Sequence, residues 1–196
     1  MPASLFSFFD VAFVGYVNNL EMNKSESLLE KAIEIALQAH RGQNDRYGAP
    51  YILHPLRVMN RMNTELEKII AVLHDVVEDT EWTFADLRKE GFSEKVITAL
   101  DCLTKRENEP YESLISRAAS NPLARRVKLA DLEDNMDARR LKNFTPKDAE
   151  RFAKYISAWR RLLGVEVSAE DVQTSSIQAS AVRAERRDPA LRGSIH

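Results

Sequence analysis

Apolar residues recur at helical spacing along most of the chain, which predicts an all-α protein. Ser27 with Glu30 forms a capping-box pattern, the prolines at 122 and 146 suit first helical positions, and Gly164 ends the last apolar stripe. We expect helices from Ser27 to about His40, from Pro55 onward, and over 65–78, 83–90, 93–104, 111–120, 121–141 and 145–164. Glycine and proline at 42, 48 and 50 mark a loop between the first two helices.

The most apolar stretch, residues 69–77, contains only two polar residues, His74 and Asp75. Such a run is compatible with a buried strand or a buried helix. A helix is favoured because good helix formers precede it at 65–68 and no strand pattern lies nearby to pair with it. An imidazole and a carboxylate therefore enter the core together and require a partner there.

The helical pattern defines a single working domain over residues 25–163. We interpret residues 1–24 as an N-terminal extension that is unlike the rest of the chain, with Met22 as an alternative first residue. Residues 164–196 are rich in Ser, Ala and Arg and have no sustained apolar face, so they are interpreted as a C-terminal tail.

Composition narrows the class of protein. The 196 residues include 28 basic and 30 acidic side chains, a net charge of −2 that argues against a general nucleic-acid binder. No apolar run reaches the roughly 18–20 residues of a membrane helix. The single cysteine, Cys102, excludes an intramolecular disulfide, and we therefore expect a cytoplasmic protein in which this thiol is a packing residue.

More polar residues gather where a core is expected. On a helix over 65–78, Glu78 lies one turn after His74, and Asp79 one turn after Asp75. Asp131 stands in a stripe of small and apolar residues, and His54 lies where the loop meets the second helix. Several carboxylates close together in a low-dielectric site repel one another unless a cation is present.

Two nitrogens and two oxygens from His54, His74, Asp75 and Asp131 would make a ligand set suited to Mn²⁺, Fe²⁺ or Zn²⁺. A purely structural polar cluster is the alternative that these residues alone leave open.

The same residues belong to spaced motifs: H-x-G-Q at 40–43, G-x-P-Y-I-x-H-P at 48–55, V-L-H-D-V-V-E-D-T at 72–80 and V-K-L-A-D at 127–131. In this order they resemble HD-domain hydrolases of the RelA/SpoT type, and more closely the small alarmone hydrolases, a group that includes a metazoan SpoT homologue. The resemblance covers about residues 25–145. It implies a helical HD bundle, usually with Mn²⁺, that removes the 3′-pyrophosphate from ppGpp or pppGpp.

The resemblance also implies roles for individual residues. It assigns metal binding to His54, His74, Asp75 and Asp131, catalysis to Glu78 and Asp79, and a nucleotide contact to Asn135. Glu78 is expected to accept the proton of the attacking water, with Asp79 supporting it. The expected partner is therefore a small phosphorylated nucleotide, with no nucleic acid and no membrane, and the oligomeric state is not predicted.

One position departs from the family pattern. The nucleotide-contacting loop usually carries two adjacent basic residues, whereas this chain has Asp45 followed by Arg46. An acid at this position removes a cation–π partner for guanine. It favours, as an alternative, a phosphatase acting on another nucleotide such as NADPH.

Two further alternatives concern binding. Arg46, Lys128 and Arg139 are candidates to contact the anionic groups of the substrate, although Lys128 and Arg139 fit a solvated helix face equally well. A nucleotide-binding HD module without turnover is the other alternative function, and the intact Glu78–Asp79 pair argues against it.

Overall fold

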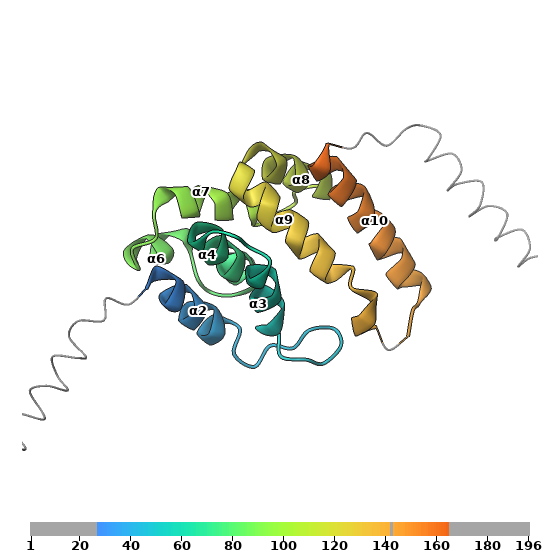
Figure 1. The fold of residues 1–196 in the computed structure, drawn as a ribbon, viewed down its shortest axis with the longest axis horizontal. Helices are drawn as coiled ribbons and strands as arrows, with labels where there is room; N and C mark the ends of the chain where they lie inside the picture. Colours follow the sequence, from blue (N-terminus) through green and yellow to red (C-terminus); the bar gives the residue numbers. More distant parts are fainter. Residues whose placement is uncertain (1–26, 142, 165–196) are drawn as a thin grey trace, which may run out of the picture.

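The structure, a computed structural model, describes residues 27–141 and 143–164 and is all-α there, with one isolated β-bridge between Asn44 and Pro50. The all-α prediction is confirmed (Figure 1). The helices are α2 (Leu28–Ala39), α3 (Leu53–Asn60), α4 (Glu65–Leu73), α5 (Val76–Asp79), α6 (Phe84–Lys89), α7 (Glu94–Leu103), α8 (Tyr111–Ser120), α9 (Pro122–Asn135), the 3₁₀ helix η1 (Ala138–Arg140) and α10 (Pro146–Leu163). The predicted extension over 1–24 and the tail beyond Gly164 lie outside the described residues.

Helix α4 forms the centre of the bundle. It packs against α2, α3, α7 and α9, and its residues from Ile69 to Leu73 are all buried. A helix that is apolar on every side is stable only when other elements surround it. The ambiguous apolar run is therefore a core helix, and His74, its C-terminal cap residue, lies inside the bundle.

Local sequence signals place most helix starts. Ser27, Thr64, Thr83 and Thr145 each make a complete capping box with an acidic residue three positions later. Gly164 ends α10 with φ 74°, a left-handed conformation that glycine adopts without a steric penalty.

Three predicted boundaries were wrong. Helix α3 begins at Leu53 rather than Pro55. The helix expected over 65–78 is interrupted at His74 and Asp75, and α5 starts at Val76. The helix expected over 121–141 ends at Asn135 and is followed by η1, because Asp137 caps this separate turn through the backbone N–H of Arg139.

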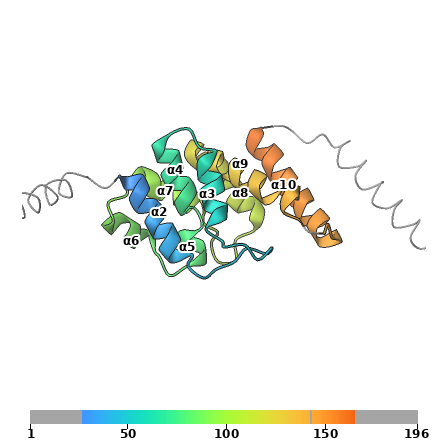
Figure 2. The same cartoon turned by 60° about the horizontal axis from the view of Figure 1, so that its bottom comes forward.

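The outer elements have a clear arrangement. Helix α10 packs on α8 and α9 at one end of the bundle, opposite α6 (Figures 1 and 2). The loop over 41–52 and η1 lie at the same edge of the molecule, which brings segments far apart in sequence together (Figure 1). Within the described residues, no helix has the length and apolarity needed to span a bilayer.

Candidate metal centre and adjoining cavity

The four predicted metal ligands come from three parts of the bundle and meet in its interior. His54 lies in the first turn of α3, His74 and Asp75 occupy the break between α4 and α5, and Asp131 lies on α9. The two histidines and Asp131 are only 3–4% exposed. The helix break matters because it lets two consecutive residues, His74 and Asp75, face the same point.

The separations between these side chains suit a single cation. His54 Nε2 lies 3.2 Å from Asp131 Oδ1 and 3.6 Å from Asp75 Oδ2. His74 Nε2 lies 3.7 Å and 3.1 Å from the same two oxygens. Ligands that each lie about 2.1 Å from one ion are about 3.0–3.4 Å apart in octahedral or tetrahedral sites. One atom each of His54, His74 and Asp131 fall within 4.8 Å of one another.

Each imidazole is oriented by a hydrogen bond at Nδ1, the ring nitrogen that faces away from the centre. His54 Nδ1 donates to Asp134 Oδ2 at 2.7 Å, and His74 Nδ1 donates to the carbonyl of Ala71 at 2.7 Å. Each Nε2 therefore faces the centre, and His74 Nε2 is buried without a hydrogen-bond partner. Buried polar atoms without partners are rare in folded proteins. Nitrogen lone pairs aimed at two carboxylates form a donor set that fits a divalent cation.

The pKa values of the two histidines also indicate that the centre attracts positive charge. Burial opposes a charge on His54, but hydrogen bonds to Asp131 and Asp134 raise its pKa to about 10. Burial likewise opposes a charge on His74, and the carboxylates of Asp75 and Asp131 raise its pKa. The cluster thus requires positive charge, which protons supply to the isolated chain and a metal ion would supply in its place.

Asp131 is held by two neighbours on α9. Lys128 Nζ donates to its Oδ2 at 2.8 Å, and Asn135 Nδ2 donates to its Oδ1 at 2.6 Å. Burial raises the cost of the carboxylate charge, but the ammonium of Lys128 brings the pKa of Asp131 well below its usual range. Lys128 does not line the adjoining cavity, whereas Asn135 does. The structure thus places Lys128 behind the carboxylate that faces both imidazoles.

Asp134 is a functional candidate that the sequence reasoning missed. Its side chain has no solvent exposure, and besides the hydrogen bond from His54 it accepts two from Arg57 and one from Arg140. Its position one turn after Asp131 on the same helix was the available signal, but the neighbouring Glu133 and Asn135 made this stretch resemble a solvated face.

Glu78 and Asp79 have different surroundings. Both residues are exposed, and Glu78 Oε2 accepts a hydrogen bond from the backbone N–H of Lys105 at 2.7 Å. Tyr51, also missed from sequence, donates from its hydroxyl to Asp75 Oδ2 at 2.6 Å and lies 3.4 Å from Asp79 Oδ2. Partial desolvation of the Asp79 carboxyl, followed by the charges of Asp75 and Glu78, raises its pKa. Asp79 is thus linked to the ligand set through one phenol.

A cavity of about 290 Å³ opens beside His54. Guanidinium, phenol and amide groups dominate its lining, which includes Arg46, Arg140, Arg151, Tyr47, Tyr51, Tyr155, Asn44 and Asn135. Arg46 and Arg151 share one carboxylate oxygen of Asp148, at 3.5 Å and 3.0 Å. Two cations on one acid leave positive charge facing the cavity, which suits an anionic ligand with an aromatic part.

The unexpected acid in the loop before α3 has a cationic partner. Asp45 Oδ2 accepts a hydrogen bond from Arg140 Nη2 at 2.6 Å, and the guanidinium carbon of Arg140 lies 5.3 Å from the ring centroid of Tyr47. A guanidinium from η1 therefore reaches the cavity although residue 45 is acidic. Arg139 is exposed, pairs with Asp137 and is not among the cavity residues, which agrees with the solvated alternative.

Comparisons with known proteins fit this geometry. The chain is 35% identical over 120 residues to a guanosine-3′,5′-bis(diphosphate) 3′-pyrophosphohydrolase from Aquifex aeolicus, covering 55% of the chain and 17% of that relative. It is 34% identical over 137 residues to a probable GTP pyrophosphokinase from Mycobacterium leprae, covering 63% of the chain and 17% of that relative. The chain thus spans less than a fifth of either relative, and no family model matches it.

The fold comparison covers nearly all of a smaller protein. A solved structure, described as a metazoan ortholog of SpoT that hydrolyses ppGpp, matches with a TM-score of 0.60 and 22% identity over 81% of this chain and 98% of its own. In sequence and fold, the chain is similar to RelA/SpoT-type HD hydrolases. The similarity to RelA/SpoT-type hydrolases expected from the motifs is confirmed, and so is the HD-type helical fold.

Proposed function

We propose that the protein is a metal-dependent phosphohydrolase that removes the 3′-pyrophosphate from ppGpp or pppGpp. The observation that carries the proposal is the convergence of His54, His74, Asp75 and Asp131, with both Nε2 atoms facing two carboxylates beside an arginine-rich cavity. Relatives named for this hydrolysis support the choice of substrate. With water, ppGpp would give GDP and pyrophosphate, and pppGpp would give GTP and pyrophosphate.

The proposed cofactor is Mn²⁺, with Fe²⁺ and Zn²⁺ as alternatives that the same ligand types accept. When bound, a divalent ion supplies an acidified water and offsets charge on phosphoryl oxygens. His54, His74, Asp75 and Asp131 would hold it. Tyr51 supports this arrangement because its hydroxyl fixes the oxygen of Asp75 that faces both imidazoles.

The remaining groups would handle the proton and the nucleotide. Glu78 is the proposed proton acceptor for the attacking water, with Asp79 supporting it. Arg46 would bind anionic groups of the nucleotide, together with Arg151 across the shared Asp148. Asn135 would contact the nucleotide from the cavity wall while it holds Asp131.

The ammonium of Lys128 donates a hydrogen bond to Asp131. We therefore propose that Lys128 influences substrate binding only indirectly, through Asp131. We also propose a cytoplasmic location, on the basis of the single cysteine and the nature of the substrate.

The decisive experiment incubates the full chain, loaded with Mn²⁺, with ppGpp, pppGpp and NADPH in parallel, and identifies the products. We expect GDP from ppGpp and GTP from pppGpp, each with pyrophosphate, and little phosphate from NADPH. His74→Ala should remove both the bound metal and the activity. Faster release of phosphate from NADPH would identify the alternative phosphatase, and tight ppGpp binding without product would identify a binding module. Hydrolysis of ppGpp by His74→Ala at the wild-type rate would contradict the proposal.

A further inference from the structure

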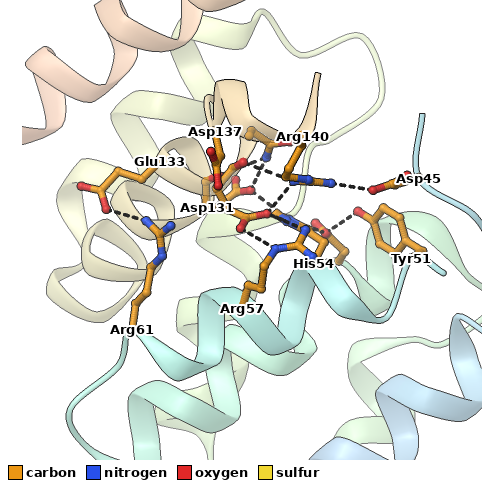
Figure 3. Close-up of polar contacts among 12 residues, drawn as sticks. Asp45, Tyr51, His54, Arg57, Arg61, Asp131, Glu133, Asp137 and Arg140 are labelled. Carbon is orange, nitrogen blue, oxygen red and sulfur yellow. Dashed lines mark hydrogen bonds and ion pairs between the residues drawn. The ribbon is translucent and has the colours of Figure 1, made fainter. Parts of the chain in front are cut away.

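Arg140 is held by two carboxylates that belong to different parts of the molecule. Its Nη2 donates at 2.6 Å to Oδ2 of Asp45, in the loop before α3 (Figure 3). Its Nη1 donates at 2.8 Å to Oδ2 of Asp134, on α9. The side chain is only 19% exposed. The planar guanidinium can satisfy both acids at once because its N–H groups project in fixed, separate directions.

Each of these acids has a second task. Asp45 Oδ1 accepts hydrogen bonds from the backbone N–H groups of Tyr47 and Ala49, both at 2.9 Å, so the same carboxylate shapes the cavity loop. Asp134 accepts the Nδ1–H of His54, whose Nε2 faces the metal centre. One guanidinium thus joins the loop that lines the cavity to the carboxylate that orients a proposed metal ligand.

Asp134 and Asp45 differ in whether a second cation pairs with them besides Arg140. Arg57 also binds Asp134, through Nε and Nη2 at 2.7 and 2.9 Å, so Asp134 retains a cation when Arg140 is changed. Within the part of the chain that the structure describes, Arg140 is the cationic side chain that pairs with Asp45. A change at Asp45 therefore acts on Arg140 and, through it, on Asp134, without touching any proposed metal ligand.

We propose that Arg140 is a positioning residue that sets both the nucleotide-facing loop and the metal-facing imidazole of His54. The inference rests on the proposed function for the meaning of the cavity, but its effect on metal binding requires no substrate. It predicts that the remote Asp45 influences metal affinity, and that this influence passes through Arg140.

The test measures Mn²⁺ affinity by titration calorimetry without nucleotide, and the KM and kcat for ppGpp, in the full chain. Arg140→Lys keeps the charge but loses the two-sided contact, and it should weaken Mn²⁺ binding by about 10-fold, as loss of partners behind a ligand typically does. Asp45→Asn should weaken Mn²⁺ binding about 3-fold and raise KM more than it lowers kcat. The double variant should bind Mn²⁺ no more weakly than Arg140→Lys alone, because both changes break one pathway.

Arg88→Lys is the matched control, since Arg88 makes a two-point contact with Glu94 on the exposed surface of the bundle. It should leave the Mn²⁺ affinity and both kinetic constants unchanged. Thermal unfolding of each variant checks that the fold persists, and Asp45→Asn alone carries the test where Arg140→Lys fails to fold.

Wild-type Mn²⁺ affinity in folded Asp45→Asn would overturn the inference, and so would additive losses in the double variant. A wild-type chain that binds Mn²⁺ without hydrolysing ppGpp would refute the proposed function instead. The affinity comparison would still decide the inference in that case.

Discussion

The candidate metal centre and the cavity wall lie side by side but are built in different ways. The proposed ligands come from the core helices and the break between two of them, and His74 is 3% exposed. The wall is built mainly from a loop, η1 and one face of α10, with Asn135 at the end of α9, and the side chain of Arg46 is 53% exposed. The proposed chemistry would thus depend on rigid elements, whereas the proposed nucleotide recognition would depend on segments that tolerate change. An acid at position 45 is one such change, and Arg140 offsets it from another segment.

Asp131→Asn should give the most severe loss at the centre. Asparagine still accepts a hydrogen bond from Lys128, but it removes the ligand charge. We expect activity to fall more than about 100-fold, which exceeds the usual effect of changing a residue behind a ligand, together with loss of bound metal. Metal analysis and product assays check this. Asp101→Asn, at an exposed helical acid paired with Arg106, should retain both metal and activity. Full metal occupancy in Asp131→Asn would argue against this ligand.

Glu78→Gln should separate catalysis from metal binding. If Glu78 accepts the proton of the attacking water, kcat should fall by about 10²-fold. The Mn²⁺ affinity should remain near that of the wild type. Asp79→Asn should lower kcat less, by about 10-fold, because we assign it a supporting role. If steady-state kinetics showed a larger loss of kcat for Asp79→Asn than for Glu78→Gln, the role of proton acceptor would be assigned to Asp79. Asp79 is linked to the proposed ligand set through Tyr51.

Arg46→Gln tests the wall without touching the centre. The loss of one cation from the cavity should raise the KM for ppGpp about 10-fold and change kcat by less than about 3-fold. Arg106→Gln is a matched control, because Arg106 is similarly exposed, at 58%, and is absent from the cavity lining. An unchanged KM in Arg46→Gln would mean that the anionic groups bind elsewhere.

Glu109→Gln probes an ion pair that is part of neither the proposed ligand set nor the cavity lining. The hydrogen bond from Arg117 lowers the pKa of Glu109 from 4.5 to about 2. Because the pKa is lower in the folded state, the pair stabilises the fold fully above pH 4.5 and loses this contribution as the pH falls towards 2.

The variant should therefore be less stable at pH 7 by about 1 kcal/mol and approach the wild type near pH 2. Urea unfolding at both pH values measures the difference, and Glu112→Gln, at a more exposed pair, should have little effect. An equal deficit at both pH values would contradict the ionic origin of the contribution.

The helices and the buried polar side chains proposed as metal ligands could be picked out from sequence for related reasons. Apolar spacing reports directly on a buried face, and His74, Asp75 and Asp131 stood out because they interrupt such spacing. Capping patterns fixed several helix starts, among them those of α2 and α10.

The cavity wall could not be predicted in the same way. Arg140 faces the cavity only because α9 ends at Asn135, whereas a helix continued to 141 would have placed residues 139 and 140 differently. Asp134 is buried by Arg57 and His54, partners 77 and 80 positions away in sequence. Tyr51 lies in a loop, where an aromatic residue is equally consistent with packing. Pairings across such distances leave no local pattern.

The burial of α4 from Ile69 to Leu73 has a consequence for how the molecule opens. Amide hydrogens around Leu73 lie in the part of the bundle that other helices surround, so their exchange with solvent should require near-global unfolding. Amides of the loop over 41–52 and of η1 have few such neighbours and should exchange through small local fluctuations. In partly opened states the chain would therefore lose the cavity beside His54 while His74 and Asp75 remain at the end of an intact helix.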